Sequence, residues 1–401
     1  MTVVSLRAWD DGVFDLTEEQ AVAIEREELA NVLVGPSAGT YRVKTGSRVG
    51  VIVGDDWEVR VSPKLDVPRL MFLLGYASDP RGWRNLVAGF EREDTLFEAI
   101  ASGFSWHAWW AVERGLLRGY VPREERSPTL RGRVMFAAQI ARGAGLATPT
   151  EIAYDDYTED ILENQLIKTA TLLLLRLPRV PRDARRRLQR VRAALELVEP
   201  LADPRRFVFP RQTRLNAGYL PALRLAELIL RASSTSALIG EFRSTTFVFD
   251  MNKVFEDFIT TAYREAMRPY GGLVRDQVQL HSLDRDGALA LRPDLSWWSG
   301  SRCLAILDAK YKAIDSGVMP NGDAYQMLAY LTAYGLRRGY LVYARDSGEM
   351  SRVHSIRNTQ CEIVVRAIDV EQEPDVVLAD VRDLAATVAA DLVRDRARAA
   401  D

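Results

Sequence analysis

One short segment constrains this 401-residue chain more than any other. An apolar run, Cys303–Leu307, ends in Asp308, and Lys310 follows two residues later. Around this run, residues 240–401 alternate short apolar segments, rich in β-branched and aromatic residues, with segments of helical spacing. A strand–helix–strand alternation around an apolar central strand is typical of an α/β core. The sequence therefore predicts a C-terminal α/β domain with a mixed central sheet.

Two aspartates and a lysine are the candidate site residues of this domain. Asp308 and Lys310 would share one face of an extended strand, about 6.6 Å apart along it. A hairpin through Ser299–Ser301 would return the chain antiparallel and bring Asp294 beside Asp308. Two converging carboxylates suit Mg²⁺ or Mn²⁺, and a neighbouring lysine can orient and polarise an attacking water. The simpler alternative is a strand that ends in water.

Flanking segments offer further candidates for the same site. Glu256 lies at the edge of the apolar stripe of the preceding helix, from which a carboxylate could reach a metal on the sheet. Gln326 and Tyr330 are four residues apart and share one face of the following helix, although ordinary helix packing also explains Tyr330. Lys312 repeats the strand spacing of Lys310 and is the alternative to it as the lysine of the site.

Residues 1–80 predict a small β-rich module. Thr17 and Gln20 form a capping-box pattern at the start of a short helix. The segment YRVKTGSRVGVIVGDDWEVRVSPKL then alternates apolar and polar residues around Gly54–Asp56. This pattern is typical of a β-hairpin with a tight acidic turn.

The middle of the chain, residues 81–238, is expected to be mainly helical. Apolar residues at helical spacing predict three long helices, at residues 95–120, 157–177 and 184–198. The segment SPTLRGRVMFAAQIARG between the first two is expected to be a strand or turn flanked by arginines.

Arginines and tryptophans in this middle region leave two interpretations open. Arg176–Arg214 contains twelve arginines and four acidic residues, an excess of eight positive charges. Such a stretch can steer toward phosphates, or it can simply be a solvated helix face. Trp106, Trp109 and Trp110 could stack on bases or pack in a helix core.

Composition excludes several classes of protein. The chain is 47% apolar and 27% charged, as expected of a soluble protein with two or three cores. Its two cysteines make neither a disulfide framework nor a four-ligand zinc site, and no Gly-x-x-x-x-Gly-Lys-Ser/Thr segment supplies a P-loop. No signal peptide is visible, and the longest apolar runs fall far below the roughly 20 residues of a membrane span, so we expect a reducing cytoplasm.

Taken together, the motifs resemble a known family. Asp294, Asp308 and Lys310 match the PD-(D/E)xK nuclease signature, with Glu256 at its helix-acid position, and Gln326 begins a Gln-x-x-x-Tyr motif that resembles the RecB-like branch. The flanks FVFDMNKVFEDFI, LRPDL, ILDAKYK and DAYQMLAY resemble McrC, the nuclease subunit of McrBC-type, modification-dependent restriction systems. Upstream segments such as GVIVGDDWEVRVSPKL and YTEDILENQLIK resemble it too, so the resemblance covers nearly the whole chain.

The resemblance implies an α+β multidomain fold. Its parts would be a β-rich N-terminal module for partner docking at residues 1–80, a mainly helical middle domain with arginine-rich helices at 81–238, and a restriction-endonuclease-like PD-(D/E)xK domain at 239–401. The activity implied is that of an endodeoxyribonuclease dependent on Mg²⁺ or Mn²⁺.

It also implies a role for each site residue. Asp294, Asp308 and Glu256 would hold the metal, Lys310 would activate water, and Gln326 would help to place the lysine or a phosphate.

Partners follow from the same resemblance. In that family a separate AAA+ GTPase, McrB, recognises modified DNA, while McrC docks through its N-terminal part, stimulates GTP hydrolysis and cuts. We therefore expect an McrB-like partner, double-stranded and base-modified DNA as substrate, and dimerisation through the nuclease domain. The acidic hairpin of residues 1–80, as a rigid projection, would suit insertion into the pore of the ring. Two alternatives remain: a stand-alone RecB-like repair nuclease, and a non-catalytic adaptor of an AAA+ motor.

Overall fold

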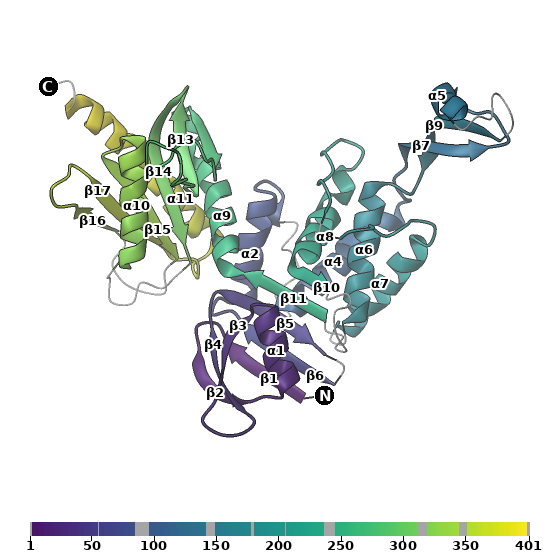
Figure 1. The fold of residues 1–401 in the computed structure, drawn as a ribbon, viewed down its shortest axis with the longest axis horizontal. Coiled ribbons are helices and arrows are strands. Elements are labelled where there is room, and N and C mark those ends of the chain that lie inside the picture. Colours follow the sequence, from purple (N-terminus) through teal and green to yellow (C-terminus); the bar gives the residue numbers. More distant parts are fainter. Residues whose placement is uncertain are drawn as a thin grey trace. The chain divides into compact units, whose positions relative to one another are not determined.

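The computed structural model describes residues 2–54, 56–84, 96–141, 149–177, 180–204, 206–235, 245–311, 319–344 and 351–398. The chain forms two compact units (Figure 1): one combines Met1–Leu96 with Ala237–Asp401, and the other is Phe97–Ser236. The N-terminal module and the C-terminal sheet therefore belong to one unit, and the middle segment forms its own. Within the described part of the chain, no helix is long and apolar enough to cross a membrane.

The N-terminal part of the first unit contains strands of two sheets and two helices. Its elements are β1 (Thr2–Arg7), β2 (Asp11–Asp15), α1 (Glu18–Arg26), β3 (Ala30–Val34), β4 (Thr40–Thr45), β5 (Arg48–Val53), β6 (Trp57–Ser62) and α2 (Val67–Ser78). Thr17 and Gln20 make the predicted capping box at the start of α1. The predicted hairpin is formed by β5 and β6, which pair antiparallel. Asp55, at its turn, lies outside the described residues.

This hairpin is not a free projection, contrary to the expectation. β1 pairs with the outer edge of β6, and β11 (Thr245–Asp250) pairs with the outer edge of β5. Gly50 allows the second contact, because a Cβ atom there would lie 2.0 Å from the carbonyl oxygen of Phe247, and its φ of 144° favours glycine. Both hairpin strands are therefore interior strands, and one of their neighbours, β11, comes from about 190 residues further along the chain.

The N-terminal module also fixes the helix that follows β11, α9 (Met251–Met267). Asp250 caps this helix, and Oγ of Ser47 donates a 2.9 Å hydrogen bond to Oδ1 of Asp250. Helix α2 packs against α9, where the rings of Phe72 and Phe258 meet edge to face with centroids 5.3 Å apart. Removing residues 1–80 would therefore expose a core that the two parts share.

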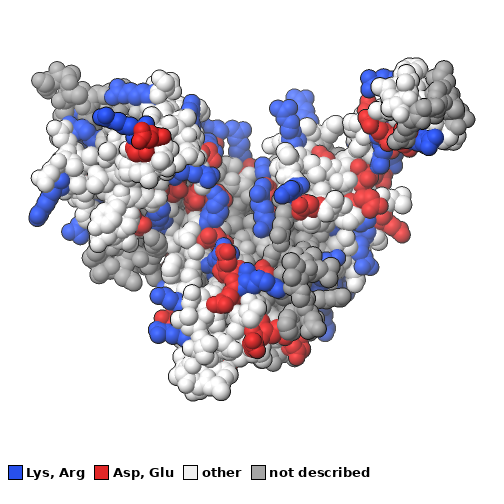
Figure 2. Space-filling model, in the orientation of Figure 1, with Lys and Arg blue, Asp and Glu red and all other residues white. Residues whose placement is uncertain are grey.

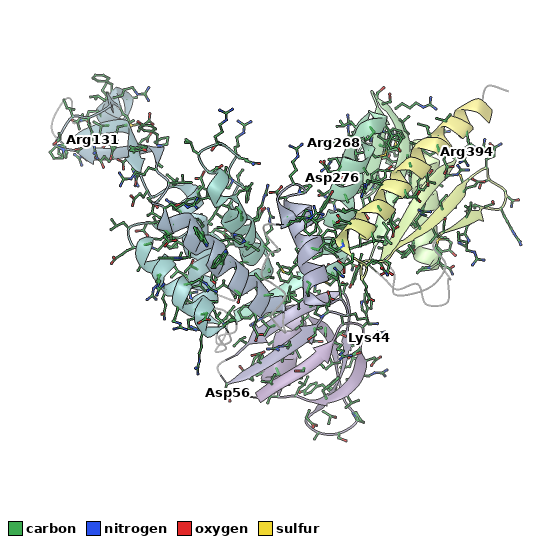
Figure 3. All side chains as sticks on the ribbon, turned by 180° about the vertical axis from the view of Figure 1, so that it is seen from behind. Lys44, Asp56, Arg131, Arg268, Asp276 and Arg394 are labelled. Atoms are coloured by element: carbon green, nitrogen blue, oxygen red, sulfur yellow. The ribbon has the colours of Figure 1, made fainter. Side chains whose placement is uncertain are left out.

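The C-terminal part of the first unit is built around a six-stranded sheet in the order β12-β13-β14-β15-β17-β16. Its elements after α9 are η2 (Arg268–Tyr270), β12 (Leu273–Asp276), β13 (Leu295–Ser299), β14 (Arg302–Lys310), α10 (Asn321–Tyr334), β15 (Arg338–Ala344), β16 (Ser351–Ser355), β17 (Glu362–Ile368) and α11 (Pro374–Arg398). Strand β15 pairs parallel with β14 and β17, whereas the remaining pairs are antiparallel. Helix α10 covers one face of the sheet and α11 the other (Figures 1 and 3), and α9 packs against α11 and β14. The predicted α+β class is confirmed.

The second unit combines helices with a small antiparallel sheet. Its elements are α4 (Leu96–Glu113), β7 (Gly119–Ser127), β8 (Arg133–Val134), α5 (Phe136–Ala141), β9 (Thr150–Thr158), α6 (Leu162–Arg176), α7 (Arg182–Ala194), η1 (Ala217–Tyr219), α8 (Leu220–Ala232) and β10 (Ser233–Thr235). The three predicted helices correspond to α4, α6 and α7. The sequence did not predict β7 and β9, which pair along their whole length and, in Figure 1, extend away from the helices of this unit. Tyr157 and Thr158, expected in a helix, belong to β9.

Candidate active site

Strand pairing brings the two predicted aspartates together. β13 and β14 are joined by a turn at Gly300, whose φ is 60°, and Leu295 pairs with Leu307. Asp294 precedes β13, so it lies opposite the end of β14 that carries Asp308. The antiparallel return of the chain that the sequence predicted is confirmed.

Asp308 and Lys310 make a buried ion pair on β14. Nζ of Lys310 lies 2.5 Å from Oδ2 of Asp308, and their side chains are 19% and 1% exposed. Oδ1 of Asp308 is also buried and accepts no hydrogen bond from any described residue. A buried carboxylate oxygen without a partner is costly. Oδ1 of Asp308 is therefore an oxygen that could coordinate a bound cation.

The charges of this site perturb its carboxylates and its lysine. Burial, followed by the negative charges of Asp308 and Glu256, raises the pKa of Asp294 to about 8, although the Ala309 amide and Lys310 oppose the shift. Burial lowers the pKa of Lys310, but the adjacent Asp308 outweighs it, so the net shift is upward. Lys310 is therefore a cation at neutral pH, and the site holds more carboxylates than this one lysine can balance.

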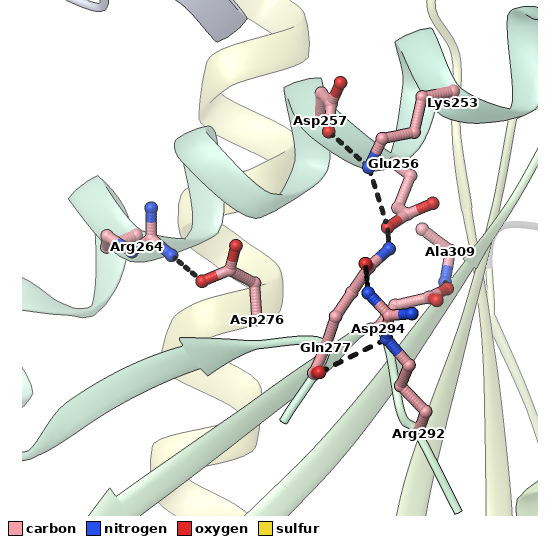
Figure 4. Close-up of polar contacts among 9 residues, drawn as sticks. All are labelled: Lys253, Glu256, Asp257, Arg264, Asp276, Gln277, Arg292, Asp294 and Ala309. Carbon is pink, nitrogen blue, oxygen red and sulfur yellow. Dashed lines mark hydrogen bonds and ion pairs between the residues drawn. The ribbon is translucent and has the colours of Figure 1, made fainter. Parts of the chain in front are cut away.

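Glu256 is held at the edge of the site by a hydrogen bond from Gln277, a residue that the sequence analysis did not single out (Figure 4). Nε2 of Gln277 donates to Oε1 of Glu256, and Oε1 of Gln277 accepts from Nη2 of Arg292. Nζ of Lys253 donates to the same Glu256 oxygen at 3.3 Å. Gln277 follows β12 and has a φ of 49°, an uncommon conformation for a residue with a side chain. No motif spacing marks it, because its role depends on contacts with two other elements.

Gln326 and Tyr330 connect α10 to the segment before Asp294. Nε2 of Gln326 donates to the Tyr330 hydroxyl at 2.9 Å, and that hydroxyl donates to the main-chain oxygen of Arg292 at 3.0 Å. Tyr330 is also part of the buried core, as ordinary helix packing predicts. The pair holds the Arg292–Asp294 segment against the helix.

A further acidic residue of α10, Asp323, was missed by the sequence analysis. Its Oδ2 accepts a 2.7 Å hydrogen bond from the buried Tyr343 hydroxyl. Its charge contributes to the raised pKa of Lys310. Asp323 therefore adds to the negative charge around the lysine.

The donor atoms of this site fit a hard divalent cation. Asp294 and Asp308 offer carboxylate oxygens, one of them without a partner. The raised pKa of Asp294 indicates that a second negative charge is unfavourable here unless a cation balances it. Among the residues that the structure describes, no three acidic, histidine or cysteine side chains gather closely enough to form a metal cluster. The geometry thus pairs the two aspartates and leaves Glu256 bonded to Gln277. Lys312, the alternative lysine, lies outside the described residues.

Two comparisons relate the chain to known proteins. A sequence model of the family described as "McrBC 5-methylcytosine restriction system component" matches residues 43–344. The fold is similar to that of a chain in the half-complex of Thermococcus gammatolerans McrB AAA+ hexamers with bound McrC, with a TM-score of 0.59 and 18% identity, over 96% of this chain and 100% of that chain. A chain of the Thermococcus gammatolerans McrBC complex matches with a TM-score of 0.41 and 20% identity, over 69% of this chain and 90% of that chain.

No curated protein matches the sequence. The family match nevertheless spans well over half of the chain and includes Asp294, Asp308 and Lys310. The resemblance to McrC that the motifs indicated is thereby confirmed, and the chain belongs to the family of McrBC 5-methylcytosine restriction system components.

Proposed function

We propose that this chain is the nuclease subunit of an McrBC-like restriction complex and cuts base-modified double-stranded DNA. Its nuclease domain would be a PD-(D/E)xK domain at residues 239–401. One observation carries the proposal: Asp294 lies against the strand that bears Asp308 and Lys310, in a member of a restriction-system family. A buried acid pair beside a lysine suits phosphodiester hydrolysis.

The residues divide the chemistry among them. Asp294 and Asp308 would hold Mg²⁺ or Mn²⁺. Glu256, which is bonded to Gln277 at the edge of the site, would be the third acid only after its carboxylate turns toward the ion. The bound ion would supply charge neutralisation and polarisation of the scissile phosphate. The ammonium group of Lys310 would orient the attacking water and stabilise negative charge on the phosphate oxygens. Gln326 would help to place the lysine or a phosphate.

Docking of an McrB-like AAA+ GTPase is proposed for the N-terminal module. Its three-stranded sheet, β2-β4-β3, aligns Val13 and Leu33 on either side of Arg42, so the three side chains share one face. Val13 is 52% and Leu33 60% exposed. Large apolar side chains that cluster on a surface mark interaction sites. This face replaces the hairpin tip as the proposed contact, because the hairpin strands are interior.

A reconstitution experiment tests the proposal. The chain is combined with an McrB-like GTPase, GTP and Mg²⁺, and the cutting of modified and unmodified plasmid is compared. The proposal expects cutting that requires modification, GTPase and metal together. Equal cutting without the GTPase would favour a stand-alone repair nuclease, and stimulated GTP hydrolysis without any cutting would favour an adaptor.

A further inference from the structure

Two tryptophans of the second unit lie on its surface. Trp106 and Trp110 are one turn apart on α4 and are 49% and 42% exposed. Their rings are 5.8 Å apart and meet edge to face. Tryptophan is highly buried on average, so an exposed pair is unusual.

Packing of the core does not explain this pair. Most of the fully buried positions of α4 lie on other faces of the helix: Ile100, Ala101, Phe104, Ser105 and Ala108. Both tryptophans follow the outer face of α4 instead. The helix-core interpretation is therefore wrong for Trp106 and Trp110, whereas Trp109 is half-buried.

Arginines line the same surface. Guanidinium groups lie over three indole rings: Arg187 over Trp106 at 6.0 Å, Arg190 over Trp109 at 5.7 Å and Arg114 over Trp110 at 5.2 Å. Arg187 also donates to the hydroxyl of Ser105 at 3.0 Å, which fixes α7 beside α4. In these contacts the guanidinium groups of Arg114, Arg187 and Arg190 lie against aromatic rings and a hydroxyl, none of which carries a negative charge.

Figure 2 shows basic and acidic side chains intermixed on the face that it draws, so no large patch of one charge stands out there. The α4–α7 surface (Trp106, Trp109, Trp110, Arg114, Arg187 and Arg190) brings three indole rings and three guanidinium groups together. Proteins that bind single-stranded nucleic acid use this pairing: bases stack on aromatic rings while cations follow the phosphates.

We propose that the α4–α7 surface binds a single-stranded segment of DNA. Trp106 and Trp110 would stack on unpaired bases, and Arg114, Arg187 and Arg190 would contact phosphates. The proposal rests on DNA being the substrate of the proposed nuclease, and it adds a second DNA contact, on a different unit from the one that contains Asp294 and Asp308. Tryptophan and arginine are also enriched at protein interfaces, so a protein partner is the outcome that the test has to exclude.

The test is DNA binding by the full chain in EDTA, which separates binding from cutting. Anisotropy of a labelled single-stranded oligonucleotide is measured for wild type, Trp106→Ala, Trp110→Ala and Trp110→Phe. Each alanine variant should weaken binding roughly fivefold or more, whereas Trp110→Phe keeps an aromatic plane and should stay within about twofold of wild type. Arg190→Gln should lower the slope of log affinity against log salt by about 0.7. Trp9→Ala is the control, since Trp9 is 44% exposed in the N-terminal module.

Several outcomes would overturn the proposal. One is a Trp106→Ala/Trp110→Ala double variant that binds the oligonucleotide like wild type. Another is an equal loss for Trp9→Ala, and a third is retained DNA binding with lost stimulation of the GTPase, which would assign the surface to a protein partner. Asp308→Asn is included to separate the two sites. It should lose cutting and keep oligonucleotide binding. A wrong nuclease proposal and a wrong binding proposal would therefore give different results.

Discussion

The main-chain amide of Ala309 donates a 3.0 Å hydrogen bond to Oδ2 of Asp294. This bond joins the segment before β13 to β14, between Asp308 and Lys310. The relative position of the two aspartates is therefore set by backbone pairing and not by flexible side chains alone. Such positioning by strands favours a site whose geometry exists before substrate arrives.

Metal binding should stabilise the protein more at high pH than at low pH. The pKa of Asp294 is raised to about 8, against about 3.9 for an unfolded aspartate, so the metal-free protein loses stability as pH rises between these values. A cation at the site offsets the burial of the charged carboxylate and the repulsion from Asp308 and Glu256 that cause this loss. The increase in Tm on adding Mg²⁺ should be larger at about pH 9 than at about pH 6. Asp294→Asn should abolish the difference, and equal increases for wild type at both pH values would contradict the account.

Gln277 should act as a positioning residue for Glu256. Gln277→Gly removes the side chain yet accepts the φ of 49°, so backbone strain does not confuse the result. We expect cutting to fall about 10- to 100-fold and the half-maximal Mg²⁺ concentration to rise, as when a residue that orients a metal ligand is lost. Gln372→Gly is the control, since the side chain of Gln372 donates a 3.0 Å hydrogen bond to Asp369, outside the candidate site. An unchanged Mg²⁺ dependence would remove the role.

Local spacing made part of this site predictable. The period of two along a strand relates Asp308 to Lys310, and a short turn returns the chain to Asp294, so a stretch of fewer than twenty residues contains the pattern. Gln277 and Asp323 were not predictable, because separate elements bring them to the site through tertiary packing.

The same distinction applies to the fold. The hairpin β5–β6 was predictable from its alternation, but its burial inside a sheet was not, because β11 joins it from about 190 residues further along the chain. β7 and β9 escaped prediction for another reason. Most of their side chains are not buried, so no apolar alternation marks the strands.

Docking of the GTPase should depend on the exposed apolar face of the N-terminal module. Leu33→Asp should strongly reduce stimulation of GTP hydrolysis while leaving Tm nearly unchanged, because Leu33 is on the surface. Val353→Asp, on the exposed edge strand β16, is the matched control and should stimulate normally. Full stimulation by Leu33→Asp would place the interface elsewhere, for example on the projecting β7–β9 strands. Point variants suit this test better than deletion of residues 1–80, which would break the packing of α2 on α9.

A pair of alanine variants decides whether Lys310 or Lys312 is the lysine of the site. Lys310→Ala should reduce cutting on the order of 10²- to 10³-fold, because a charged donor beside the reacting phosphate is lost. Its affinity for Mg²⁺ should stay the same or increase, because an ammonium group binds no metal and repels it. Lys312→Ala should cut normally. The opposite pattern, a silent Lys310→Ala and an inactive Lys312→Ala, would move the role by one strand repeat.

Cutting by Asp308→Asn tests the central claim most directly. The substitution keeps the size of a side chain that is 1% exposed and removes its charge from beside Asp294, so the fold and docking of the GTPase should persist. With GTPase, GTP and Mg²⁺ present, the account predicts wild-type stimulation of GTP hydrolysis and no detectable nicking or linearisation of modified plasmid. Cutting by Asp308→Asn at the wild-type rate would contradict it.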